Sequence, residues 1–171
     1  GYCFEGSENV FLTAAATAKR LLWICTPYFV PDLPLLRSLT LTAARGVDVR
    51  VIVPKKNNHR FMGLASKNMY ETLLAHGVRI FERTGNFSHA KAMLCDNEWC
   101  LFGSSNCDVR SFRLNYELDL LISDGPFVRD LFTQLCEEFE QADEVSLQDA
   151  AKTSFPQRLA QAFCALFRPI L

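Results

Sequence analysis

The sequence has no uninterrupted run of 18 apolar residues, no Cys-x-x-Cys pair and no internal repeat. Without a long apolar run, these 171 residues contain no segment of the kind that spans a bilayer as a helix. Without a Cys-x-x-Cys pair, a zinc ribbon is not expected. The seven cysteines are an odd number, which argues against a closed disulfide framework and favours a reducing compartment.

The sequence also lacks a large excess of charge of either sign, since the net charge is −1. Residues 1–120 carry 14 Lys and Arg against 11 Asp and Glu, and residues 121–171 carry 4 against 8. Nucleic acid is therefore not expected as a partner. Part of the basic excess follows a predicted strand and is either a solvated face or an anion-facing rim: Arg50, Lys55, Lys56 and Arg60.

Apolar periodicity organises the first half of the chain into alternating helices and strands. A helical pattern over 8–20 leads into the short apolar run LLWIC. Further helical patterns cover 33–46 and 60–77, and strand patterns cover 47–54 and 78–82. This alternation predicts a single α/β domain, in which a mixed, largely parallel β-sheet lies between helices.

The second half has a different pattern. Strand-like runs cover 89–96 and 98–104, and the short polar Asp-Asn-Glu between them predicts a β-hairpin. Alternation over 115–123 predicts one more strand, and 126–142 is typical of an amphipathic helix with proline in its first turn.

The last segment, 153–171, is typical of an amphipathic helix, and we separate it from the lobe formed by residues 1–152. Its apolar stripe consists of Phe155, Leu159, Phe163, Leu166, Phe167 and Ile170. Such a helix either packs on the lobe or lies at a membrane interface.

Residues with chemical potential gather around the predicted hairpin. In an extended strand, residues two apart point to the same face, so His89 and Lys91 are expected to project together. Imidazole can act near neutral pH as nucleophile or proton donor, and an ammonium group suits a phosphate oxygen. The turn Gly103–Asn106 can supply neutral donors, and Glu117 can orient the histidine ring.

These residues resemble a known family. The pattern His-x-Lys-x4-Asp-x6-Gly-Ser-x-Asn is the signature of the phospholipase D superfamily. The stretches TPYFVPD, AARGVDVRVIVPKKNN and CDVRSFRLNYELDL resemble the C-terminal half of bacterial cardiolipin synthases. Every fixed position of the signature is occupied here, by His89, Lys91, Asp96, Gly103, Ser104 and Asn106.

The resemblance implies roles for these residues. Lys91 and Asn106 would bind phosphate with support from Ser104, and Glu117 would orient His89. Asp96, at the hairpin turn, is included in the catalytic motif, although its role is expected to be more structural than chemical. The family works through a phosphohistidine intermediate and requires no metal or other cofactor.

Only one such motif is present, whereas the family builds its active site from two. His59 and His76 are not followed by lysine at the second position. The second motif is expected from another lobe of the same longer chain, which fits the absence of an initiator methionine, or from a homodimer partner. In the first case His89 would be the general acid or base rather than the primary nucleophile.

The resemblance favours a phosphatidyl transferase of the cardiolipin synthase type, which passes a phosphatidyl group to an alcohol. Its expected partners are a phospholipid substrate and a membrane surface, and its expected place is peripheral, on the cytoplasmic side of a bacterial cell membrane. Two alternatives remain. One is a phospholipase D-type hydrolase or a homodimeric phosphodiesterase or nuclease, and the other is an inactive half that acts as a binding lobe.

Overall fold

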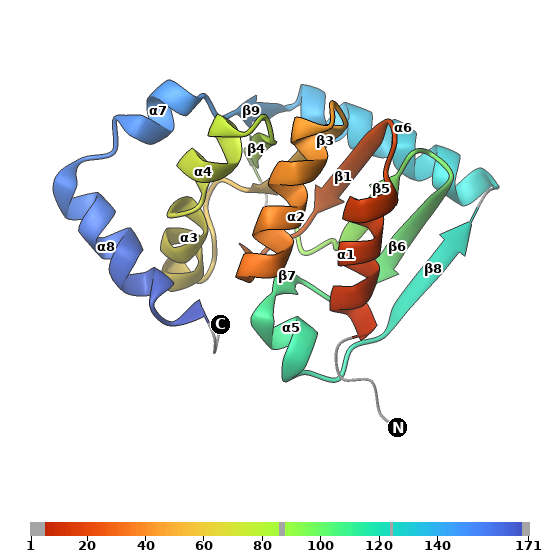
Figure 1. Cartoon of the computed structure of the whole chain (residues 1–171), viewed down its shortest axis with the longest axis horizontal. Helices are drawn as coiled ribbons and strands as arrows, with labels where there is room; N and C mark the ends of the chain where they lie inside the picture. The colour runs from red at the N-terminus through yellow and green to blue at the C-terminus, as the bar shows by residue number, and fades with distance from the viewer. Residues whose placement is uncertain (1–5, 86–87, 124, 169–171) are drawn as a thin grey trace.

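The computed structural model describes residues 6–85, 88–123 and 125–168 (Figure 1). Its main feature is a seven-stranded sheet with the spatial order β8-β6-β5-β1-β3-β4-β9. Its strands are β1 (Leu21–Cys25), β3 (Asp48–Pro54), β4 (Arg79–Arg83), β5 (Ala92–Cys95), β6 (Trp99–Gly103), β8 (Asp119–Ser123) and β9 (Ala142–Glu144). The α/β class and the mixed sheet are as predicted.

The three strands of the first half, β1, β3 and β4, are parallel neighbours. The connection from β1 to β3 contains helix α2 (Leu33–Ala44), and the connection from β3 to β4 contains α3 (Arg60–Lys67) and α4 (Tyr70–Ala75). Parallel strands need such long crossovers, so the alternation of helix and strand patterns in the sequence correctly predicts the parallel pairing of these three strands.

The sheet is less parallel than predicted, because only two of the six neighbouring pairs within the described residues are parallel. The cause lies in the second half. β5 and β6 are joined by a three-residue hairpin loop with Asp96 and Asn97 at positive φ, which reverses the chain direction. β8 then pairs antiparallel with β6, and β9 with β4.

Several elements differ from the sequence-based expectation. The helix predicted over 60–77 is interrupted at Asn68 and Met69, and the strand predicted over 115–123 begins only at Asp119. A small parallel sheet joins β2 (Phe29–Val30) to β7 (Cys107–Asp108). It was not predicted, because its two strands are far apart in sequence and each has only two residues.

Helices cover both faces of the large sheet (Figure 1). On one face, α1 (Gly6–Thr17), α2, α3, α4 and the short α5 (Val109–Arg113) contribute to a buried cluster centred on side chains such as Phe11, Leu39 and Phe112. On the other face, α6 (Pro126–Glu140) buries Val128, Leu131, Leu135 and Phe139.

The remaining helices are α7 (Leu147–Ala151) and α8 (Phe155–Ala165). α8 buries Cys164, and after its end Arg168 donates a hydrogen bond of 2.7 Å to Asn68. Most of the predicted apolar stripe is nevertheless exposed, with Phe155 78% and Leu159 62% accessible. Ile170 lies outside the described residues. None of the described helices is long and apolar enough to cross a bilayer.

Candidate active site

His89 and Lys91 lie together immediately before β5, which begins at Ala92. The Lys91 Nζ atom lies 3.0 Å from Nδ1 of the His89 ring and donates a hydrogen bond of 2.8 Å to the His89 carbonyl oxygen. Lys91 is buried, with 8% of its surface accessible, whereas His89 is exposed. The two side chains therefore meet as their spacing predicted, although the regular strand starts one residue later.

This contact changes the protonation of both groups. Although the His89 side chain is exposed, partial desolvation of its ring and the positive charge of Lys91 lower its pKa. Burial also lowers the pKa of Lys91, and the carboxylates of Glu117 and Asp108 oppose that shift. The lowered pKa favours the neutral form of the His89 ring, and the lysine beside it can attract an anion.

Replacing Lys91 with methionine should raise the pKa of His89, because the neighbouring positive charge that disfavours the imidazolium ion is removed. The pKa can be read from a pH titration of the histidine ring signals by nuclear magnetic resonance. His76, whose Nδ1 lies 2.7 Å from the Thr72 carbonyl oxygen, serves as the internal reference. An unchanged or lower His89 pKa in Lys91→Met would contradict the assigned contact.

Asn106 lies at the end of the Gly-Ser-x-Asn turn and is held by Ser111 of α5. The Ser111 Oγ atom accepts hydrogen bonds from the Asn106 backbone N–H at 3.0 Å and from Nδ2 at 3.3 Å. The Asn106 Oδ1 atom is buried and has no hydrogen-bond partner among the described residues. Since a hydroxyl both donates and accepts, the carboxamide can turn over, bond Ser111 through Oδ1 and leave Nδ2 free for a phosphate oxygen.

Ser104 and Glu117 form a second pair in the site. The Ser104 hydroxyl donates a hydrogen bond of 2.5 Å to Glu117 Oε2, and Asn115 donates one of 3.2 Å to Oε1. Ser104 therefore braces the carboxylate whose charge acts on Lys91. The bond from Glu117 to the His89 ring stays a prediction, as does a direct contact of Ser104 with phosphate.

Gly103 is required by a close approach of two strands. A Cβ atom added there would lie 2.4 Å from the Leu118 carbonyl oxygen and 2.6 Å from Asp119 Cα. The Asp119 carboxylate in turn accepts hydrogen bonds from the Ser105 backbone at 3.1 Å and from the Ser7 hydroxyl at 2.7 Å. Only glycine allows the turn to lie this close to the segment that carries Glu117.

Asp96 is held by hydrogen bonds from the backbone of a distant segment of the chain. Its buried carboxylate accepts hydrogen bonds from the backbone N–H groups of Lys19, Arg20 and Leu21, at 2.9, 2.7 and 3.0 Å for the shortest contact of each. Burial alone would raise the pKa of Asp96, but these three bonds outweigh it, and the pKa is lowered. Asp96 thus ties the hairpin that carries the site to the loop between α1 and β1.

A cavity of about 320 Å³ opens beside Asn106. Its wall includes Tyr28, whose ring lies edge-on to His89 with centroids 5.9 Å apart, and His59, whose ring centroid is 5.6 Å from that of Tyr28. Asp108 also lines the cavity and caps α5 by accepting from the Ser111 N–H at 2.8 Å. Within the described residues, no group of three His, Cys, Asp or Glu side chains is placed to hold a metal ion.

Sequence reasoning missed Ser111 and Asp108 as parts of the site. The spacing Asp-x-x-Ser is a helix-capping signal that could have indicated a short helix at 109–113. The contact of Ser111 with Asn106 had no comparable signal, because it depends on the turn between them.

Comparison with known proteins agrees with this geometry. The family model described as "Cardiolipin synthase, PLD-like domain" matches residues 11–142. Cardiolipin synthase A of Pseudomonas putida is 40% identical over 167 residues, which are 98% of this chain and 35% of that protein. Cardiolipin synthase of Halalkalibacterium halodurans is 32% identical over 168 residues, 98% of this chain and 33% of that protein. The chain spans about a third of the length of these relatives.

Two solved structures show the same fold. Phosphatidylserine synthase from Haemophilus influenzae has a TM-score of 0.75 at 20% identity, and covers 96% of this chain and 45% of its own. The phospholipase D family member Nuc from Salmonella typhimurium has a TM-score of 0.70 at 19% identity, with 81% of this chain and 90% of its own covered. These likenesses concern the fold, and the family model and the relatives confirm the resemblance seen in the motif. The chain belongs to the phospholipase D-like domain family of the cardiolipin synthases.

Proposed function

We propose that the chain is one catalytic lobe of a phosphatidyl transferase of the cardiolipin synthase type. The observation that carries this proposal is the contact between the buried Lys91 ammonium group and the exposed His89 ring, 3.0 Å apart. A cation and a potential nucleophile or proton carrier at one point suit attack on a phosphodiester. The similarity to cardiolipin synthase A, which is 40% identical over 98% of this chain, supports a lipid substrate.

In the proposed reaction, Lys91 and Asn106 bind the non-bridging oxygens of a phosphodiester. A histidine ring nitrogen bonds to phosphorus as the bond from phosphorus to the first alcohol oxygen breaks. That oxygen takes its proton from a second histidine, supplied by another lobe or copy. The acceptor alcohol then gives its proton to the same second histidine and attacks phosphorus, and the bond between phosphorus and the first histidine's nitrogen breaks, which regenerates that histidine.

The low pKa of His89 bears on which of the two roles it takes. Without a ligand the neutral ring is favoured, because desolvation and Lys91 disfavour its charged form. A bound phosphodiester adds a negative charge beside Lys91 and so favours the imidazolium ion. Substrate binding would therefore favour protonation of His89, and a protonated ring can act as the general acid that donates a proton to the leaving alcohol.

The exposed apolar surface around Glu117 is an argument for contact with a second lobe. Within the loop that carries Glu117, three large apolar side chains are exposed: Leu114 is 62%, Tyr116 95% and Leu118 76% accessible. Exposed apolar residues gathered beside a catalytic site are typical of an interface. We propose that a second motif-bearing lobe covers this loop and completes the active site.

The peripheral place of the enzyme, on the cytoplasmic side of the membrane, is part of the same proposal. The exposed side chains of α8, Phe155, Leu159 and Phe163, form an apolar surface suited to the lipid interface. A phospholipid substrate also requires access to a membrane surface.

A shared site should make transfer depend on assembly, and this tests the proposed function. We expect the isolated chain to show little conversion of phosphatidylglycerol to cardiolipin at dilutions where sedimentation detects only monomer. Activity should appear on dimerisation or on addition of a second lobe. Full specific activity of a dilute monomer would refute the shared site, and no conversion under any of these conditions would refute the transferase assignment.

A further inference from the structure

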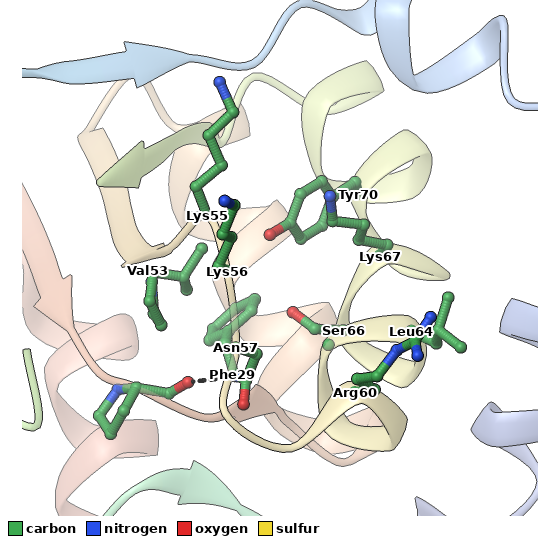
Figure 2. A pocket seen from close by; sticks show the side chains of 13 residues that line it. Phe29, Val53, Lys55, Lys56, Asn57, Arg60, Leu64, Ser66, Lys67 and Tyr70 are labelled. Atoms are coloured by element: carbon green, nitrogen blue, oxygen red, sulfur yellow. Dashed lines mark hydrogen bonds between the residues drawn. The ribbon is translucent and has the colours of Figure 1, made fainter. Parts of the chain in front are cut away.

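A second, larger cavity of about 420 Å³ lies at the carboxyl end of β3, and we call it the basic pocket (Figure 2). Its polar wall is formed by Lys55, Lys56, Arg60, Ser66, Lys67 and Tyr70. Figure 2 shows Lys55 and Lys56 on one side and Arg60 and Lys67 across from them. Of the basic residues clustered in the sequence, Arg50 lies elsewhere, with its guanidinium 4.7 Å from the Trp23 ring centroid.

Carboxylates neutralise only part of this pocket. Lys55 forms an ion pair of 2.6 Å with Asp143, and Lys67 one of 3.1 Å with Glu82. For Lys56 and Arg60, no carboxylate of the described residues lies within ion-pair distance. The pocket therefore keeps a positive charge that an anion can neutralise.

Ser66 gives an independent indication of a ligand. Its side chain is buried, with 6% of its surface accessible, and Oγ has no hydrogen-bond partner among the described residues. It lies close enough to the Tyr70 phenol to lower the pKa of that group against the effect of burial, but no hydrogen bond of regular geometry joins the two side chains. A buried hydroxyl without a partner is costly, so one that faces a basic cavity is suited to a ligand oxygen.

The floor of the pocket is apolar. Phe29 and Val53 are buried there, and Leu64 is half-buried, whereas the basic side chains of Lys55, Lys56 and Arg60 are exposed. A free phosphate ion would leave this floor unused, and it would fill only a small part of about 420 Å³. The combination suits an anionic group attached to an apolar body.

The basic pocket and the active site share one segment of chain. Pro27 and Phe29 line the pocket, whereas Tyr28 between them contacts His89. Asn57, from the pocket wall, donates a hydrogen bond of 2.9 Å to the Pro27 carbonyl oxygen. A group held in the pocket thus lies on the other side of the segment that borders the His89 ring.

The geometry points to the basic pocket as a binding site for the phosphate of an anionic phospholipid, separate from the phosphodiester held by His89 and Lys91. This inference rests on the proposed function in one respect: a transferase that joins two phospholipids must place the second beside the first. Binding itself does not require catalysis, so the two ideas can fail separately.

The test uses dihexanoyl phosphatidylglycerol, a soluble short-chain lipid, as the probe for the whole chain. Amide signals of residues 55–67 are followed by nuclear magnetic resonance. The double variant Lys56→Gln/Arg60→Gln should weaken binding about tenfold or more, because it removes two charge-assisted contacts. The matched control Arg129→Gln/Lys152→Gln removes two exposed charges from α6 and the segment after α7, and should leave binding unchanged.

Further arms identify the ligand and the site. Inorganic phosphate should bind at least about tenfold more weakly than the lipid, because it cannot use the apolar floor. Equal affinity would overturn the lipid assignment. His89→Ala should retain lipid binding at residues 55–67. If His89→Ala abolished that binding, or if the double variant preserved it, the separate site would be refuted, whatever the outcome for transfer.

Ser66→Ala provides a sharper variant. It should weaken lipid binding several-fold while the melting temperature of the ligand-free chain stays the same or rises, because a buried unpaired hydroxyl is removed. A lower melting temperature would show that the hydroxyl stabilises the fold, and would overturn its assignment to a ligand.

Discussion

Replacing Asp96 with alanine should lower the free energy of unfolding by about 2–4 kcal/mol, because three backbone N–H groups would lose the buried carboxylate that accepts from them. These donors belong to Lys19, Arg20 and Leu21, some 75 residues earlier in the chain. Urea unfolding at neutral pH measures the loss. A large loss of stability would show that Asp96 attaches the hairpin to the loop before β1.

Two variants control this experiment. Asp96→Asn keeps one acceptor oxygen and a residue that tolerates the positive φ of 55°, so it should be less destabilising. Asp149→Ala removes an exposed carboxylate that accepts from the Ser146 hydroxyl, and should cost much less. If Asp96→Ala were no more harmful than Asp149→Ala, the anchoring role would be wrong.

The pH dependence has a definite sign. The pKa of Asp96 is lower in the folded chain than its usual 3.8, so the folded state favours the ionised carboxylate. The stabilisation is therefore present above about pH 4 and is lost as the pH falls through the lowered pKa. Asp96→Ala should lose less stability than the unmodified chain over that acidic range.

What the sequence could predict is local. The spacing of His89 and Lys91 places both side chains on one side of the chain, whether or not the strand is regular there, and the contact follows. The parallel strands of the first half are likewise encoded by helices of sufficient length between them.

What it could not predict depends on pairs distant in sequence. The small sheet pairs Phe29 with Cys107, and the acceptor for the Lys19 N–H is the Asp96 carboxylate. No periodic pattern marks either partner. The number of antiparallel pairs could not be predicted for a related reason. The sequence does not indicate that β8 pairs with β6 and β9 with β4, at opposite edges of the sheet.

His89→Ala should reduce phosphatidyl transfer at least about 10³-fold, whether the ring acts as nucleophile or as general acid and base. Alanine keeps the hairpin but removes both ring nitrogens, which lie 3.0 and 3.5 Å from Lys91 Nζ. The fold should persist, because His89 is exposed and precedes the regular strand.

The chain offers a matched control for this substitution. His76→Ala removes an exposed histidine at the end of α4, whose Nδ1 atom lies 2.7 Å from the Thr72 carbonyl oxygen of the same helix. The His76→Ala variant should transfer the phosphatidyl group at the rate of the unmodified protein. A loss seen only in His89→Ala is then due to the catalytic ring and not to the removal of a histidine in general.

The most direct measurement is the formation of cardiolipin from phosphatidylglycerol by the assembled two-lobe enzyme, compared among the unmodified protein, His89→Ala and His76→Ala. The proposed function predicts product from the first and third, and almost none from the second, with all three equally folded. Product from His89→Ala at the unmodified rate would contradict it.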